Sequence, residues 1–269
     1  MSRRRVWAIV RKDLTEVTSS KSVMVPMVIA PLVLCVVLPA VVLLVGLSGA
    51  TAKLNGMDLI GKLVARYPVP AGFGSIMDQV MFVFLNYSFL PFFMIIPVLA
   101  SSIIAANSVV GEKERGTLET LLYTPISNRE LVEAKLLSSF IPSLVVTAGG
   151  FLGYFLVSNA IFWAYRGQLI VRSVIWIPAL LLLAPSVSLL GLSITLLVSL
   201  RAKTYIEAQQ LSAMVVIPFV VLLYAQIGGL LVLSPLWVVG LGIAALVVSY
   251  VIYGKIGPRF SREQILMTL

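Results

Sequence analysis

The 269-residue sequence contains no histidine, one cysteine and few charged residues. Without histidine, the chain lacks His-ligated metals, axial haem histidines and Ser-His or Cys-His catalysis. The lone Cys35 excludes an internal disulfide and any paired-cysteine site. Charged residues make up 12% of the chain, about half their share in soluble domains, whereas 59% of residues are hydrophobic. These shortages exclude a soluble enzyme and a disordered tail, and they indicate a membrane protein.

Long stretches without Asp, Glu, Lys or Arg predict where the chain crosses the membrane. Four of them each accommodate one helix of about 20 residues across a hydrocarbon core roughly 30 Å thick. The fifth, at 208–254, is about twice that length, and Gly228, Gly229, Ser234 and Pro235 predict a turn within it. The sequence therefore predicts an all-α integral membrane protein with a single transmembrane domain, residues 1–269, and six transmembrane helices. The predicted spans are 23–48, 79–108, 133–158, 173–200, 209–231 and 236–254.

The distribution of Lys and Arg between the connectors predicts the orientation. With the N-terminus inside, the charged inner stretches 1–21, 112–135, 201–207 and 255–269 carry 15 basic residues, and the outer stretches 53–78 and 166–172 carry 5. Because inner loops collect Lys and Arg, both termini are expected in the cytoplasm, and the net charge of +9 gives no reason to invoke nucleic acid. Trp163, Trp176 and Trp237 are expected at the outer interface. The outer connectors are 49–78, 159–172 and 232–235, and the inner segments are 1–22, 109–132, 201–208 and the tail 255–269.

The two inner segments nearest the N-terminus have helical patterns of their own. In residues 1–22, Val6, Ile9, Val10, Leu14 and Val17 fall on one helical face, which predicts an amphipathic helix at the inner interface; a basic stretch that only sets topology is the alternative. In the loop at 109–132, a helix break, an N-cap, a stop and a capping box together predict a short helix with an apolar stripe. Gly116 is the helix break, Thr117 is the N-cap of the short helix, and Pro125 ends it. Ser127 with Glu130 forms the capping box of the next helix, and the apolar stripe consists of Leu118, Leu121 and Leu122.

A two-turn helix is marginal in water, so this one needs a surface to pack on, either its own bundle or a partner. The run from Glu112 to Leu122, followed by Pro125-Ile126-Ser127 and Glu130-Leu131, strongly resembles the signature of permease subunits of ABC-2 type ABC exporters. Weaker supporting fragments are Arg11-Lys12-Asp13-Leu14, Glu207-Ala208-Gln209-Gln210 and Phe260-Ser261-Arg262-Glu263.

The resemblance implies a prokaryotic plasma-membrane exporter whose permease binds cytosolic ATPase chains through this loop. The short helix would be the coupling helix and residues 1–22 the connecting helix. Two permease chains and two ATPase chains would form the working unit, with ATP and magnesium bound by the ATPase and no catalytic, cofactor or metal site in this chain. The implied coupling interface consists of Glu112, Glu114, Arg115, Gly116, Thr117, Leu118, Glu119, Leu121, Leu122, Pro125, Ile126 and Ser127.

Polar side chains inside the predicted spans are few, and no Asp or Glu lies deep in any of them. Carriers that work alone commonly use such acids, so energy delivered from outside the bilayer is favoured over a stand-alone channel or secondary carrier. An integral-membrane enzyme is a further alternative, but no acid cluster or base supports it. Gly149 and Gly153 allow close helix approach, either within one subunit or between two. Candidates for lining a translocation path are Asn86, Tyr87, Ser88, Tyr224 and Gln226.

Overall fold

The computed structural model describes residues 3–48, 61, 64–117, 127–199, 201–202, 204–228 and 230–259. Within these ranges the regular elements are helices, and no strand occurs. Among the described residues, six helices are long and apolar enough to cross a membrane, which confirms the expected all-helical architecture with six such helices. They are Lys21–Leu47, Ile76–Glu114, Glu130–Arg166, Trp176–Ser199, Tyr205–Gln226 and Pro235–Lys255.

Most of these spans consist of several helical elements, because π-helical or 3-10 turns interrupt the α-helix. Pro31 and Pro178 directly precede two of the π-helical turns; proline has no N–H to donate, so the backbone ladder must rearrange locally. Span 1 consists of α2 (Lys21–Pro31), η1 (Leu32–Val37) and α3 (Leu38–Leu47). Span 2 consists of α5 (Ile76–Val83), η2 (Phe84–Ser88), α6 (Phe89–Ala106), η3 (Asn107–Gly111) and α7 (Glu112–Glu114). Span 3 is the single helix α9 (Asn128–Arg166). Span 4 consists of α10 (Trp176–Pro178), η4 (Ala179–Leu183) and α11 (Ala184–Ser199). Span 5 consists of α12 (Tyr205–Ala213), η5 (Met214–Val216) and α13 (Ile217–Ile227), and span 6 is α14 (Pro235–Arg259).

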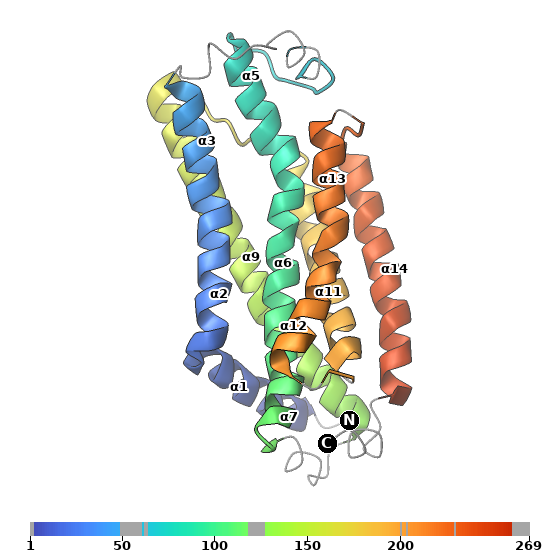
Figure 1. Ribbon diagram of the computed structural model, residues 1–269. Helices are drawn as coiled ribbons and strands as arrows, with labels where there is room; N and C mark the ends of the chain where they lie inside the picture. Colours follow the sequence, from blue (N-terminus) through green and yellow to red (C-terminus); the bar gives the residue numbers. More distant parts are fainter. Residues whose placement is uncertain are drawn as a thin grey trace.

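The spans run side by side, and α1 (Arg3–Ser19) lies across one end of the bundle (Figure 1). At this end, called the α1 end below, span 2 finishes in α7 and span 3 begins in α9. The apolar residues Val6, Ile9 and Val10 of α1 are buried in a cluster with Val109 of span 2 and Leu131 of span 3. The predicted helical face of residues 1–22 therefore packs on the protein's own bundle.

Span 2 is the most buried of the six spans and occupies the middle of the bundle. Small residues let its neighbours approach closely: a methyl group at Gly191 of α11 would lie 3.1 Å from the Ser101 hydroxyl oxygen of α6. Gly153 of α9 similarly faces span 1, where a methyl group would lie 3.1 Å from Val36, whereas Gly149 has no such neighbour within 4 Å among the described residues. Gly153 thus serves packing within the subunit.

One of the three tryptophans near the outer connectors is buried inside the bundle. Trp163 and Trp237 are exposed, at 62% and 57%, but Trp176 is 4% exposed. Its ring packs edge-on against Phe93, with centroids 5.4 Å apart, and also contacts Tyr154. Trp176 thus packs inside the bundle instead of on its surface, because the chain runs back along the bundle before α10 begins and places the ring in the aromatic core.

Candidate functional site

The predicted coupling loop emerges between two defined helix ends. On one side, Gly116 adopts a left-handed φ of +67°, a conformation that favours glycine and ends the helix after α7. On the other side, Ser127 caps α9: its hydroxyl accepts a hydrogen bond from the Glu130 N–H at 3.2 Å, and the Glu130 carboxylate accepts one from the Ser127 N–H at 3.1 Å. The predicted capping box is confirmed.

The middle of the loop lies outside the described residues. This applies to Leu118, Glu119, Leu121, Leu122, Pro125 and Ile126, and so to the predicted short helix itself. The loop's two ends are described: Thr117 and Ser127 are both exposed, and the Thr117 hydroxyl donates to the Glu112 carbonyl oxygen at 3.4 Å. The residues that flank these ends form the candidate functional site.

Lys135, two turns into α9, holds two buried carboxylates together. Its Nζ lies 2.7 Å from Glu112 Oε2 at the end of span 2 and 3.2 Å from Asp13 Oδ2 in α1. Lys135 and Glu112 are 1% exposed and Asp13 is 3% exposed. The hydroxyls of Ser108 and Ser138 each donate to Asp13 Oδ2 at 3.0 Å. Buried charges need such partners, and here the partners come from three separate helices.

A second layer of charges surrounds this core. Lys12 forms an ion pair with Glu112 and lies 3.6 Å from both Asp13 and Glu16. Arg115, just past the end of α7, forms an ion pair with Glu16 of α1. We refer to Lys12, Asp13, Glu16, Glu112, Arg115 and Lys135 as the ion network.

Three of the predicted interface residues have partners within the chain. Glu114 Oε1 accepts a hydrogen bond from the Tyr205 N–H at 3.0 Å, which connects α7 to the start of α12. Glu112 is buried in the ion network, so its carboxylate is not available on the surface. Arg115 is partly exposed and paired with Glu16.

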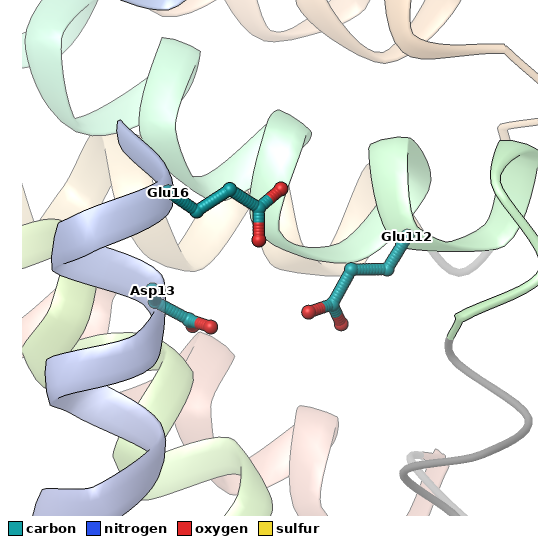
Figure 2. Close-up of side chains that lie close together, drawn as sticks. All are labelled: Asp13, Glu16 and Glu112. Atoms are coloured by element: carbon teal, nitrogen blue, oxygen red, sulfur yellow. The ribbon is translucent and has the colours of Figure 1, made fainter. Parts of the chain in front are cut away.

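Three carboxylates of the ion network lie close enough together to resemble a metal site. Figure 2 shows Asp13, Glu16 and Glu112 facing a common space, and one oxygen of each lies within 4.8 Å of the others. Lys12 and Lys135 already neutralise this space, and Arg115 neutralises Glu16, so that three acids meet three bases. A divalent cation would have to displace ammonium groups from their hydrogen bonds. The arrangement fits an ion-pair network better than a metal centre.

The ion network keeps Lys12 charged at physiological pH. Partial burial lowers the pKa of the Lys12 ammonium group, but its hydrogen bond to Glu112 and the charges of Glu112, Asp13 and Glu16 together outweigh burial. The pKa is therefore raised above its ordinary value of 10.5. Lys12 therefore stays protonated throughout the physiological range.

Sequence reasoning named Glu112 and Arg115 but missed the partners that bury Glu112. One signal was present: Asp13 falls on the same helical face as Val6, Ile9, Val10 and Val17, all of which are buried. A charge on the buried face of a helix requires a buried counter-charge. The sequence did not indicate that this counter-charge is Lys135, which lies 122 residues further along the chain.

At the opposite end of the bundle, four of the five candidate path residues are buried. Asn86, Tyr87, Ser88 and Gln226 are at most 7% exposed, and the Gln226 amide donates to the Tyr87 carbonyl oxygen at 3.2 Å. Tyr224, in contrast, is 70% exposed on α13. The structure therefore brings Tyr87 and Gln226 together but places Tyr224 on the outer surface of the chain.

Two buried asparagines hold the non-helical chain that connects spans 3 and 4. The Asn86 amide donates to the Ile170 carbonyl at 2.8 Å, and its oxygen accepts from the Ser173 N–H at 3.1 Å. Asn159 accepts from the N–H groups of Ile170 and Val171, both at 2.9 Å. Backbone groups outside a helix need such partners when water is excluded. Asn159 was not among the predicted residues, because its partners lie in a connector whose path depends on the fold.

The six apolar helices and the apolar surface around them define a multi-pass membrane protein. Residues 7–236 match the family model described as ABC-2 family transporter protein. The chain therefore belongs to the ABC-2 transporter family, whose membrane permeases lack an ATPase domain of their own. None of the curated proteins compared with the chain matches it.

Proposed function

We propose that this chain is the permease subunit of an ATP-driven exporter that is moved by separate cytosolic ATPase chains through the loop at 112–126. Two permease copies, or one copy and a paralogue, would form the translocation path, and two ATPase chains would bind ATP and magnesium. Both termini and the α1 end would face the cytoplasm of a prokaryotic cell. The excess of basic residues in the connectors at that end supports this orientation.

The observation that carries the proposal is that both ends of the loop are attached to the same buried ion network. Glu112 is the first residue of the loop, Lys135 lies beyond its other end in α9, and the two side chains meet at 2.7 Å. Asp13 adds α1 to the same contact. A displacement of the loop would therefore move the end of span 2, the start of span 3 and α1 together, since breaking a buried ion pair is costly.

The attachment of both loop ends to the ion network fits a lever mechanism. ATP-driven closure of the ATPase pair would push on the short helix predicted within the loop, and the ion network would pass the movement to spans 2 and 3. In this proposal Leu118, Leu122 and Ile126 provide apolar contacts to the ATPase, and Glu119 provides charge. Glu112 belongs to the ion network that anchors the loop and not to the surface that contacts the ATPase, because it is buried.

Other parts of the expected organisation also belong to this proposal. The segment boundaries given for spans and connectors, and the interfacial position of α1, stay predictions. The same holds for a translocation path lined by Asn86, Tyr87, Ser88, Tyr224 and Gln226. The burial of Asn86, Tyr87, Ser88 and Gln226 in one subunit is compatible with a path that opens only when the spans move, whereas Tyr224 is already exposed.

The experiment is co-purification with an ABC ATPase encoded beside this chain's gene, combined with its permease-dependent ATP hydrolysis. Leu122→Glu places a charge on the predicted apolar contact and is expected to reduce ATPase retention at least roughly tenfold, as expected for loss of a desolvated anchor. Leu230→Glu makes the same chemical change at the opposite end of the bundle, where Leu230 is 86% exposed, and should leave retention unchanged.

A second variant separates docking from transmission. Lys135→Met leaves the loop sequence intact but weakens the ion network that anchors the loop. The ATPase should therefore still bind, while permease-dependent ATP hydrolysis falls. If Leu122→Glu retains the ATPase with full stimulation, the loop is not the contact, and the proposal is refuted.

A further inference from the structure

One face of α1 is covered by the bundle, and the opposite face is open. The covered face carries Val6, Ile9, Val10, Asp13 and Val17, all at most 8% exposed. Residues on the opposite side recur at intervals of three and four and are all exposed, so they form one stripe along the helix. We call this set the outer stripe of α1: Arg4, Trp7, Ala8, Arg11, Thr15 and Thr18.

The outer stripe combines two unpaired cations with an exposed indole ring. Within the described ranges, neither Arg4 nor Arg11 forms an ion pair. Trp7 is 58% exposed and lies three residues after Arg4 and four before Arg11, so the three side chains sit on consecutive turns of one face. The acids of the same helix, Asp13 and Glu16, are turned towards the ion network. The stripe therefore presents positive charge without a counter-charge.

The position of α1 places this stripe at the edge of the apolar surface of the bundle. A single residue, Ser20, separates α1 from span 1, so the helix cannot move away from the start of that span. Span 1 exposes Val25, Val28 and Ile29 by 51% to 54% within its first turns. Exposed apolar side chains on a membrane span face lipid tails, so α1 lies at the depth of the headgroups, where tryptophan is favoured.

We propose that the outer stripe of α1 binds the phosphate groups of anionic phospholipids. Guanidinium groups bind phosphate oxygens in a bidentate manner, and the Trp7 ring provides the interfacial anchor between them. Basic side chains near an anionic membrane surface add affinity that neutral headgroups cannot supply. The site would fix the resting position of the helix that carries Asp13 and Lys12 of the ion network. It does not depend on the identity of the ATPase.

The test is a lipid titration of the purified full chain, followed by native mass spectrometry. Dioleoyl phosphatidylglycerol is compared with dioleoyl phosphatidylcholine, and the variant is Arg4→Gln combined with Arg11→Gln. The matched control is Arg201→Gln combined with Lys255→Gln, which removes two exposed basic groups outside α1. Because both arginines are exposed, the variant should unfold at the same temperature as the parent chain, so any change in lipid binding is local.

The parent chain and the control should prefer phosphatidylglycerol. The variant should bind its tightest phosphatidylglycerol about 30-fold more weakly, as expected for two basic groups, while binding of phosphatidylcholine is unchanged. An unchanged preference in the variant, or an equal loss in the control, would overturn the proposal. It would also be overturned if the variant kept its lipid preference but lost the ATPase in co-purification, because the stripe would then be a protein interface.

Discussion

Replacing Lys135 with methionine removes the ammonium group that lies between Asp13 and Glu112 and keeps an unbranched side chain in its place. Both carboxylates are almost completely buried, so water cannot replace the lost cation. The ion network then holds three acids and two bases. The substitution therefore tests directly whether this network stabilises the α1 end of the bundle.

The expected cost lies at the lower end of the range for breaking a buried ion pair, about 3 kcal/mol. The lower end applies because both acids keep other partners. Asp13 still accepts hydrogen bonds from Ser108 and Ser138 at 3.0 Å, and Glu112 keeps its ion pair with Lys12. For a chain of this size, about 3 kcal/mol corresponds to a decrease of roughly 6–12 °C in the unfolding temperature.

The assay is thermal unfolding of the purified chain in mild detergent, monitored by intrinsic fluorescence. Lys255→Met is the matched control, since Lys255 is exposed at the end of α14, and it should change stability by less than about 0.5 kcal/mol. Glu112→Gln combined with Lys135→Met completes a double-mutant cycle. The double variant leaves two acids and two bases, so it should be more stable than the sum of the single effects predicts, by at least about 1 kcal/mol.

Two results would refute this reasoning. If Lys135→Met costs less than about 1 kcal/mol, the ammonium group is not required by the buried carboxylates. If the single effects of Lys135→Met and Glu112→Gln add within about 0.5 kcal/mol, the two side chains do not interact energetically. Either outcome would also contradict the proposal that the ion network holds both ends of the loop rigidly.

Two further experiments test other contacts of the fold. Asn159→Leu leaves the N–H groups of Ile170 and Val171 without their acceptor, which should cost about 2–5 kcal/mol and accelerate hydrogen exchange of these two amides; slow exchange in the variant would contradict the assignment. Gly191→Leu should cost at least about 1–3 kcal/mol by pushing α11 away from α6, whereas Gly149→Leu, at a position without close neighbours, should leave the unfolding of the isolated chain nearly unchanged; equal effects would contradict the packing described for α11.

Several elements could be predicted from the sequence because they depend on local physics. Uncharged stretches of sufficient length must form helices in a bilayer, since only internal hydrogen bonds can satisfy the backbone there, and the six long apolar helices follow from this rule. The helix stop at Gly116 and the capping box of Ser127 with Glu130 depend on residues at most three positions apart. The family resemblance rested on the same short stretch, and the match over residues 7–236 confirms the family.

The burial of Trp176 shows where local rules stop. Tryptophan next to a connector is usually interfacial, but here the connector follows two buried asparagines back along the bundle. That path depends on which faces of spans 2 and 3 meet. A single sequence contains the composition of those faces but not their partners.

The sequence by itself thus determined the membrane-spanning class, the six apolar helices and the two ends of the loop at 117–127. The tertiary structure alone decided that Asp13, Glu112 and Lys135 meet in one buried network. Hydrophobicity and helix capping act over a few neighbouring residues and can be read along the chain. A buried ion pair forms only where the packing of distant helices brings opposite charges together and excludes water from both.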